Sequence, residues 1–198
     1  MLTFKETVEK PRLVIKYDNY ADSPRNWCNI GKFITIDSRC DSPDDDSDFI
    51  YVVKETAQYA KNTENHIDLI KKMLADDYDE EVIYIVPISK YEHSGISYSI
   101  GKSFGFDYSN NGFYIVTKKS LNIFGLTEYN EETLNEYILN ELEVYNQYVN
   151  GQVYLFELYD NEGYFTDSCG DFYAIDDIKE HLPEEFKDEN LNDYLIFG

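Results

Sequence analysis

The chain has 198 residues, 42% of them hydrophobic, and its 19 Tyr and 12 Phe exclude wholesale disorder, because disordered acidic chains are poor in aromatic residues. No apolar run approaches the ~20 residues that span a bilayer and no basic-then-apolar signal sequence opens the chain, so we expect a cytoplasmic protein. The net charge of -22 is concentrated, since residues 128–198 hold 19 Asp and Glu against two Lys, whereas residues 1–36 hold four acids against six bases.

The first third of the chain predicts two strands and then two helices. Residues 13–17 and 32–36 read as strands, and the turn-forming residues between them allow a long-looped hairpin. Apolar residues from Phe49 onward follow the i, i+3, i+4, i+7 spacing of a helix, in spite of a local β-branched run. A second helix is expected to begin with Thr63 as its N-cap and to end near Asp76.

The middle of the chain predicts the core of a sheet. The β-branched run at 82–88 suits a strand that is covered on both faces, and residues 95–100 and 113–117 predict two further strands. The Ser-Asn-Asn-Gly segment at 109–112 predicts the turn that precedes the last of these strands. A short helical turn is expected at 119–124.

The clearest predicted element is a long helix between Asn130 and Gly151. Asn130 can act as the N-cap, and Gly151 stands where a left-handed residue commonly ends a helix. One face of the helix carries an apolar stripe, which consists of Leu134, Tyr137, Ile138, Leu142, Tyr145 and Val149.

The last part of the chain predicts a hairpin and an acidic tail. Residues 153–159 and 164–166 read as strands joined by a turn, and the tail reads as two short acidic helices split at Pro183. We therefore predict an α+β fold, with a central antiparallel or mixed sheet and helices packed on one face. The expected domains are an α+β core at 1–173 and an acidic helical tail at 174–198, packed on the core.

The exposed face of the long helix is a row of carboxylates. Glu132, Glu136 and Glu143 fall close together on a helical wheel, opposite the apolar stripe, and no Lys or Arg lies between residues 128 and 163. Duplex DNA carries one negative charge per ~1.7 Å of its axis. An α-helix rises ~1.5 Å per residue, so carboxylates at every third or fourth residue of two or three neighbouring elements approach the linear charge density of DNA. The face is therefore either a nucleic-acid-like surface or a merely solvated one.

The candidate partner-binding residues are acids in the last third of the chain and two residues of an earlier loop. Trp27 and Arg25 are included because Trp and Arg dominate interface hot spots, although a core plug beneath the hairpin is the favoured interpretation of Trp27. The candidate acids are Glu131, Glu132, Glu136, Glu143, Asp160, Glu162, Asp176, Asp177, Glu180, Glu184 and Glu185.

Catalysis has one candidate constellation. His93 and Cys169 could form a nucleophile pair, with Asp167 as the acid that orients the base, although a hydrogen-bonded structural histidine is the more common interpretation. A phosphate-binding Gly loop, a G-x-S-x-G elbow and an H-E-x-x-H motif are all missing from the sequence. An enzyme therefore remains the alternative, and no cofactor is expected.

Metal and disulfide sites are not indicated either. The acidic segment 41–48 lacks the Gly and Glu that complete a calcium-binding loop, so a solvated loop is expected. Cys28, Cys40 and Cys169 are odd in number and show no zinc-ligand spacing, so we expect reduced and partly buried thiols.

Five blocks of the sequence carry a resemblance to a known family. They are Ser23-Pro24-Arg25-x-Trp27-x-Asn29-x-Gly31, His93-Ser94-Gly95-Ile96, the segment 112–118, the segment 143–154, and Asp167-Ser168-Cys169-Gly170-Asp171-Phe172-Tyr173. Over about residues 12–175 the chain resembles small, acidic, largely uncharacterised proteins of bacteriophages and other mobile elements. It departs from their pattern at 108–111, where Tyr-Ser-Asn-Asn replaces a more compact loop, and the resemblance carries no known activity.

The resemblance implies a mobile-element origin and favours an antagonist of host defence. The leading hypothesis is a non-enzymatic inhibitor of a bacterial defence nuclease, of anti-CRISPR or antirestriction type, whose acidic surface blocks a basic groove and does not bind nucleic acid itself. The alanine-poor composition resembles that of a low-GC host, which makes a Cas9-type effector a candidate target, since its DNA-binding channel is basic. The alternatives are a Cys/His hydrolase and an acidic protein-interaction adaptor.

Overall fold

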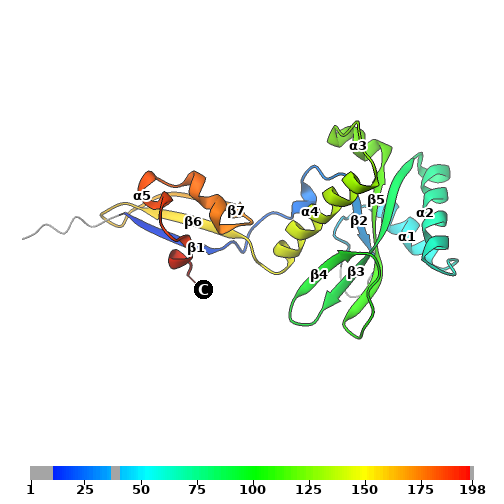
Figure 1. Ribbon diagram of the computed structural model, residues 1–198, viewed down its shortest axis with the longest axis horizontal. Helices are drawn as coiled ribbons and strands as arrows, with labels where there is room; N and C mark the ends of the chain where they lie inside the picture. The colour runs from blue at the N-terminus through cyan, green and yellow to red at the C-terminus, as the bar shows by residue number, and fades with distance from the viewer. Residues whose placement is uncertain (1–10, 37–40, 197–198) are drawn as a thin grey trace, which may run out of the picture. The chain divides into compact units, whose positions relative to one another are not determined.

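The structure is a computed structural model that describes residues 11–36 and 41–196 (Figure 1). The chain divides into two compact units. The larger unit is Ser23–Asn146, and the smaller unit combines the chain before Ser23 with the chain after Asn146. The expected boundary between residues 173 and 174 falls inside the smaller unit. In the described ranges, no helix combines the length and the apolar character needed to cross a bilayer.

The larger unit is built on a four-stranded antiparallel sheet with the order β2-β5-β3-β4. Its strands are β2 (Lys32–Thr35), β3 (Val82–Glu92), β4 (Ile96–Ile100) and β5 (Tyr108–Thr117). Its helices are η1 (Pro24–Asn26), α1 (Ser47–Ala57), α2 (Thr63–Tyr78), α3 (Lys118–Phe124) and α4 (Glu131–Val149), whose last residues pass into the smaller unit.

Helices cover both faces of this sheet. Successive residues of a strand point to opposite faces, so β2 contributes to two different layers. Ile34 belongs to the core that α1 and α2 form with the sheet, whereas Phe33 packs edge-to-face on Tyr98 and on Tyr145 of α4. Figure 1 shows α4 on one side of the sheet and the pair α1 and α2 on the other.

Side-chain caps begin the helices of the larger unit. Asp46 accepts from the Phe49 amide at the start of α1, and Asn62 accepts from the Asn65 amide at 2.7 Å at the start of α2. The N-cap of α2 is therefore Asn62 and not the predicted Thr63. Asn130 accepts from the Thr133 amide at 2.8 Å, as expected for the N-cap of α4.

The smaller unit is a three-stranded antiparallel sheet with the order β1-β6-β7 and helices on one face. Its elements are β1 (Arg12–Tyr17), β6 (Tyr154–Tyr159), β7 (Phe165–Phe172), η2 (Ile175–His181), α5 (Glu184–Lys187) and η3 (Leu191–Tyr194). Ile15 and Phe156 of the sheet form one core with Ile178, Phe186 and Leu191 of the three short helices. The α+β fold class is confirmed, with two sheets in place of one central sheet and, in the larger unit, with helices on both faces of the sheet and not on one as predicted.

Two predicted turns differ from the structure. The strands at 13–17 and 32–36 do not pair as a hairpin, because β1 pairs with β6 and β2 with β5. A long loop fixes neither partner nor register, so distant strands can compete for the pairing. Residues 109–112 lie inside β5, where a side chain on Gly112 would press on Ile88 and Thr35 of the neighbouring strands. This glycine serves close strand approach and not a turn.

Candidate acidic interface

The predicted carboxylate face of α4 is confirmed as exposed. Leu134, Ile138 and Leu142 are buried under the helix, while the four candidate acids of α4 are exposed. These four, which we call the α4 acidic face, are Glu131, Glu132, Glu136 and Glu143. No described Lys or Arg forms an ion pair with any of them.

The fifth acid of α4, Glu141, turns inward and was not anticipated. Its carboxylate accepts from the Arg25 guanidinium at 2.8 Å, from the Ile30 amide at 2.9 Å and from the Tyr114 hydroxyl. On a helical wheel Glu141 lies beside the apolar stripe, which was the available signal for its burial. The inward carboxylate ties α4 to the loop before β2 and to β5.

Arg25 is the centre of this buried network. Only 8% of Arg25 is exposed, and its guanidinium donates to Asp44 at 2.7 Å, to Glu141 at 2.8 Å and to the Gly31 carbonyl at 2.9 Å. Burial alone would lower the pKa of Arg25, but the surrounding Tyr114, Asp44 and Glu141 raise it above its ordinary value. The structure therefore places Arg25 inside the larger unit, and not on the surface where a partner would meet it.

Asp44 belongs to the same network, which corrects the expectation of a solvated loop at 41–48. Asp44 is 8% exposed and also accepts from the Phe33 amide, while Asp46 caps α1 and lies 3.3 Å from Lys32. Within 11–36 and 41–196, His, Cys, Asp and Glu side chains form no group of three that could hold a metal ion.

Trp27 does not plug the core, because 49% of its surface is exposed. Its loop is held firmly, since the Asn29 amide donates to the carbonyls of Pro24 at 3.1 Å and of Trp27 at 2.9 Å, and Arg25 donates to Asn29. The core-plug interpretation is therefore wrong. A partner anchor at Trp27 stays a prediction.

The candidate catalytic residues are distributed over the two units. His93 lies in the larger unit, 68% exposed and 3.8 Å from Asp107. Cys169 lies on β7 of the smaller unit, where its thiol is exposed, and Asp167 accepts from the neighbouring Ser168 amide. Cys28 is also free and exposed, so neither described thiol is partly buried, and Cys40 lies outside the described residues.

The inhibitor hypothesis predicts that alanine at His93 or at Cys169 leaves inhibition of a target unchanged, because that hypothesis gives neither residue a chemical role. The measurement is a titration of inhibitory activity with each single variant, after circular dichroism has shown that the variant is folded. Loss of activity in either folded variant, or inhibition by far less than one equivalent, would favour the hydrolase alternative.

In the smaller unit, acids far outnumber bases. Its described residues include 15 Asp and Glu but only four Lys and Arg. Each lysine already has an acidic partner, since Lys16 lies 2.7 Å from Glu157, Lys179 3.0 Å from Asp176 and Lys187 2.6 Å from Glu184; the fourth base, Arg12, stacks over Tyr159. Hydrogen bonds from Lys16 and Tyr159 lower the pKa of Glu157.

Most of the remaining acids of the smaller unit are exposed and form no ion pair with a described base. Four of the candidate acids form no ion pair with a described base: Glu162, Asp177, Glu180 and Glu185. Asp160 has a structural task, because it accepts from the backbone amides of Glu162 and Tyr164, both at 2.9 Å, and so closes the turn between β6 and β7. Most of the predicted acidic surface is therefore both exposed and unneutralised.

A cavity of about 740 Å³ in the smaller unit brings three of the candidate acids together. Asp160, Glu162 and Glu185 line it, and they are joined by Glu189, which the sequence analysis did not single out. Asp160 and Glu162 come from the turn between β6 and β7, whereas Glu185 and Glu189 come from α5 and the segment after it, and no local pattern in the sequence indicates that these segments meet.

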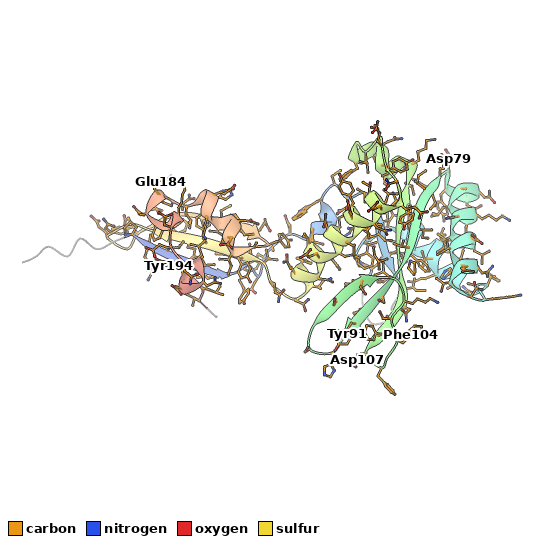
Figure 2. The ribbon with its side chains drawn as sticks, viewed as in Figure 1. Asp79, Tyr91, Phe104, Asp107, Glu184 and Tyr194 are labelled. Atoms are coloured by element: carbon orange, nitrogen blue, oxygen red, sulfur yellow. The ribbon has the colours of Figure 1, made fainter. Side chains whose placement is uncertain are left out.

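An exposed aromatic tip in the larger unit was also missed. Phe104 and Phe106 are almost fully exposed in the connection from β4 to β5, and Figure 2 shows Phe104 near Tyr91 and Asp107. The connection is fixed by two hydrogen bonds between Ser103 and Asn110, at 3.0 and 2.9 Å. Exposed apolar side chains of this kind commonly mark an interaction surface.

Comparison of the chain with models of protein families, with curated proteins and with solved structures found no match.

Proposed function

We propose that this protein is a non-enzymatic inhibitor of a bacterial defence nuclease, made by a bacteriophage or another mobile element. In this proposal its acidic surface occupies the basic groove in which the nuclease holds DNA or RNA. The single observation that carries the proposal is the placement of charge: the α4 acidic face and most of the smaller unit's carboxylates are exposed and form no ion pair with a base among the described residues.

Stability does not account for this arrangement. Like charges at i and i+4, such as Glu132 and Glu136, weaken a helix by a few tenths of a kcal/mol. A high net charge also weakens the compact state by self-repulsion. Binding to a basic surface of a partner accounts for the exposed carboxylates, and a nucleic-acid-binding groove is such a surface.

A Cas9-type effector is the target class that we propose, acting in the cytoplasm of the infected host. Its arginines that read the short DNA motif beside the target, and the channel that holds the guide–target duplex, are both positively charged. The proposal includes no direct contact between this protein and nucleic acid, because both are strongly acidic. The adaptor alternative shares the acidic surface but involves no competition with nucleic acid.

The test of this proposal is competition measured at two salt concentrations. The target is first captured from host lysate with the tagged protein, and its affinity for this protein is then measured with and without duplex DNA. We expect affinity to fall at least about tenfold between roughly 50 and 200 mM salt, because exposed charge pairs are screened. We also expect the protein to displace DNA from the target.

Two results would contradict nucleic-acid mimicry. An affinity that does not change with salt would show that the contact is not mainly electrostatic. A stable ternary complex in which the duplex stays in its groove would favour the adaptor alternative, because the two ligands would then occupy different sites.

A further inference from the structure

The cavity of the smaller unit has an apolar floor. Leu13 and Phe186 are buried at 3% and 6% exposure, and the ring of Tyr194 stands edge-on to Phe186 with the centroids 5.9 Å apart. Figure 2 shows Tyr194 on the smaller unit, on the short helix η3. The volume of the cavity, about 740 Å³, lies within the range of ligand pockets, roughly 300–1,000 Å³.

Carboxylates form the rim of the same cavity. Glu162, Glu185 and Glu189 line it without a hydrogen bond or ion pair from their side chains to any described residue, and Asp160 lines it beside them. Burial, together with the charges of Glu189 and Asp193, raises the pKa of Tyr194, which is consistent with a negative field at this wall. An apolar floor below a carboxylate rim fits a long aliphatic side chain that ends in a cation.

A cation of this kind already lies on the edge of the cavity. The Arg12 guanidinium stacks over the Tyr159 ring, 4.4 Å from its centroid, and Arg12 is the one cation among the described residues that line the cavity. It offsets only one of the four carboxylates. For the remaining three carboxylates, an arginine side chain of a ligand is a better partner than a lysine, because the planar guanidinium forms paired hydrogen bonds with carboxylates and stacks on aromatic rings.

We propose that this cavity binds an arginine side chain from a basic segment of the partner protein. The aliphatic part of the arginine lies on Leu13, Phe186 and Tyr194, and its guanidinium meets Glu185 and Glu189. This inference rests on the proposed function. It adds the chemistry by which the acidic surface selects a partner, because the cavity recognises arginine specifically and not any positive charge.

The experiment uses the full chain labelled with nitrogen-15 and three capped tripeptides: triarginine, trilysine and tricitrulline. We expect triarginine to bind saturably, with the largest chemical-shift changes at the amides around Phe186, Glu189 and Tyr194. Trilysine is expected to bind several-fold more weakly, and tricitrulline, which keeps the shape but loses the charge, not at all.

Two matched variants separate the cavity from the rest of the acidic surface. Glu185→Gln with Glu189→Gln removes two rim charges and is expected to weaken triarginine binding about tenfold. Asp177→Asn with Glu180→Gln removes two exposed charges without ion pairs to described bases from the same unit outside the cavity, and is expected to change binding by less than about threefold. Equal losses in the two variants, or shift changes spread evenly over the acidic surface, would overturn the proposal.

The failures of the two proposals are distinguishable. If the rim variant inhibits the nuclease and competes with DNA as well as the parent protein does, the arginine cavity is refuted while mimicry stands. If triarginine binds in the cavity but inhibition shows no salt dependence, mimicry is refuted while the cavity stands. Absence of any saturable triarginine binding refutes the cavity directly.

Discussion

Replacement of Arg25 by alanine is expected to reduce the free energy of unfolding by about 3–5 kcal/mol. The substitution removes the guanidinium that lies between Asp44 and Glu141 and leaves two carboxylates without a counter-charge inside the larger unit. It also removes the hydrogen-bond donors to the Gly31 carbonyl and to Asn29. Urea denaturation followed by circular dichroism measures the loss, and the transition can be followed separately by the fluorescence of Trp27.

The control for this prediction is an exposed ion pair of the same unit. Lys118 lies 3.0 Å from Glu81 with more than half of each side chain exposed, so Lys118→Ala is expected to have little effect on stability. A double-mutant cycle of Arg25→Ala and Asp44→Ala should show strong coupling, because each residue loses its partner in either single variant. Additive effects, or a loss below about 1 kcal/mol for Arg25→Ala, would show that the network does not stabilise the fold.

Charge reversal on the α4 acidic face is the second large expected effect. Changing Glu132, Glu136 and Glu143 to Lys alters the local charge by six units, because each substitution replaces a negative charge with a positive one. We expect affinity for the proposed nuclease target to fall at least about a hundredfold, since like charges brought together across an interface cost several kcal/mol. Folding should survive, because the buried stripe is unchanged and the like-charge pairs are relieved.

A second helix of the same unit supplies the matched control. Asp68, Asp76 and Asp77 are exposed on α2, and their change to Lys also alters the charge by six units. Two of them lie in the last turn, where a positive charge suits the helix dipole. The acidic loop at 41–48 is unsuitable as a control, because Asp44 is buried and Asp46 caps α1. If the α4 variant inhibits as well as the parent, the α4 acidic face is only solvated and the partner must be sought near Trp27.

The α4 helix could be predicted almost completely from the sequence because its determinants are local. The cap at Asn130, the buried stripe at every third or fourth residue and the left-handed Gly151 all act within a few residues of the helix. The exposed carboxylates follow from the same periodicity. This part of the candidate site was therefore accessible before any tertiary structure was known.

The partners of β1 and of Arg25 could not be predicted in this way. The sequence places Arg25 in a polar loop, Asp44 in an acidic loop and Glu141 on an acidic helix, so each resembles a solvated charge. Their burial depends on three segments that meet only in the folded unit, since Arg25 is 19 residues from Asp44 and 116 residues from Glu141 in the sequence. The cavity of the smaller unit has the same origin, because its floor combines Leu13 with Phe186 and Tyr194.

The pairing of β1 with β6 has a consequence for the order in which the two units fold during synthesis. Arg12 of β1 pairs with Tyr159 of β6, so β1 is synthesised well over 100 residues before the strand that pairs with it. The strands of the larger unit are complete by Thr117, and that unit is a continuous segment that can fold while synthesis continues. The smaller unit, with its carboxylate-lined cavity, is completed after the larger unit and by a pairing of high contact order. The acidic surface of the smaller unit is therefore assembled only after β6 and the short helices that follow it have been synthesised.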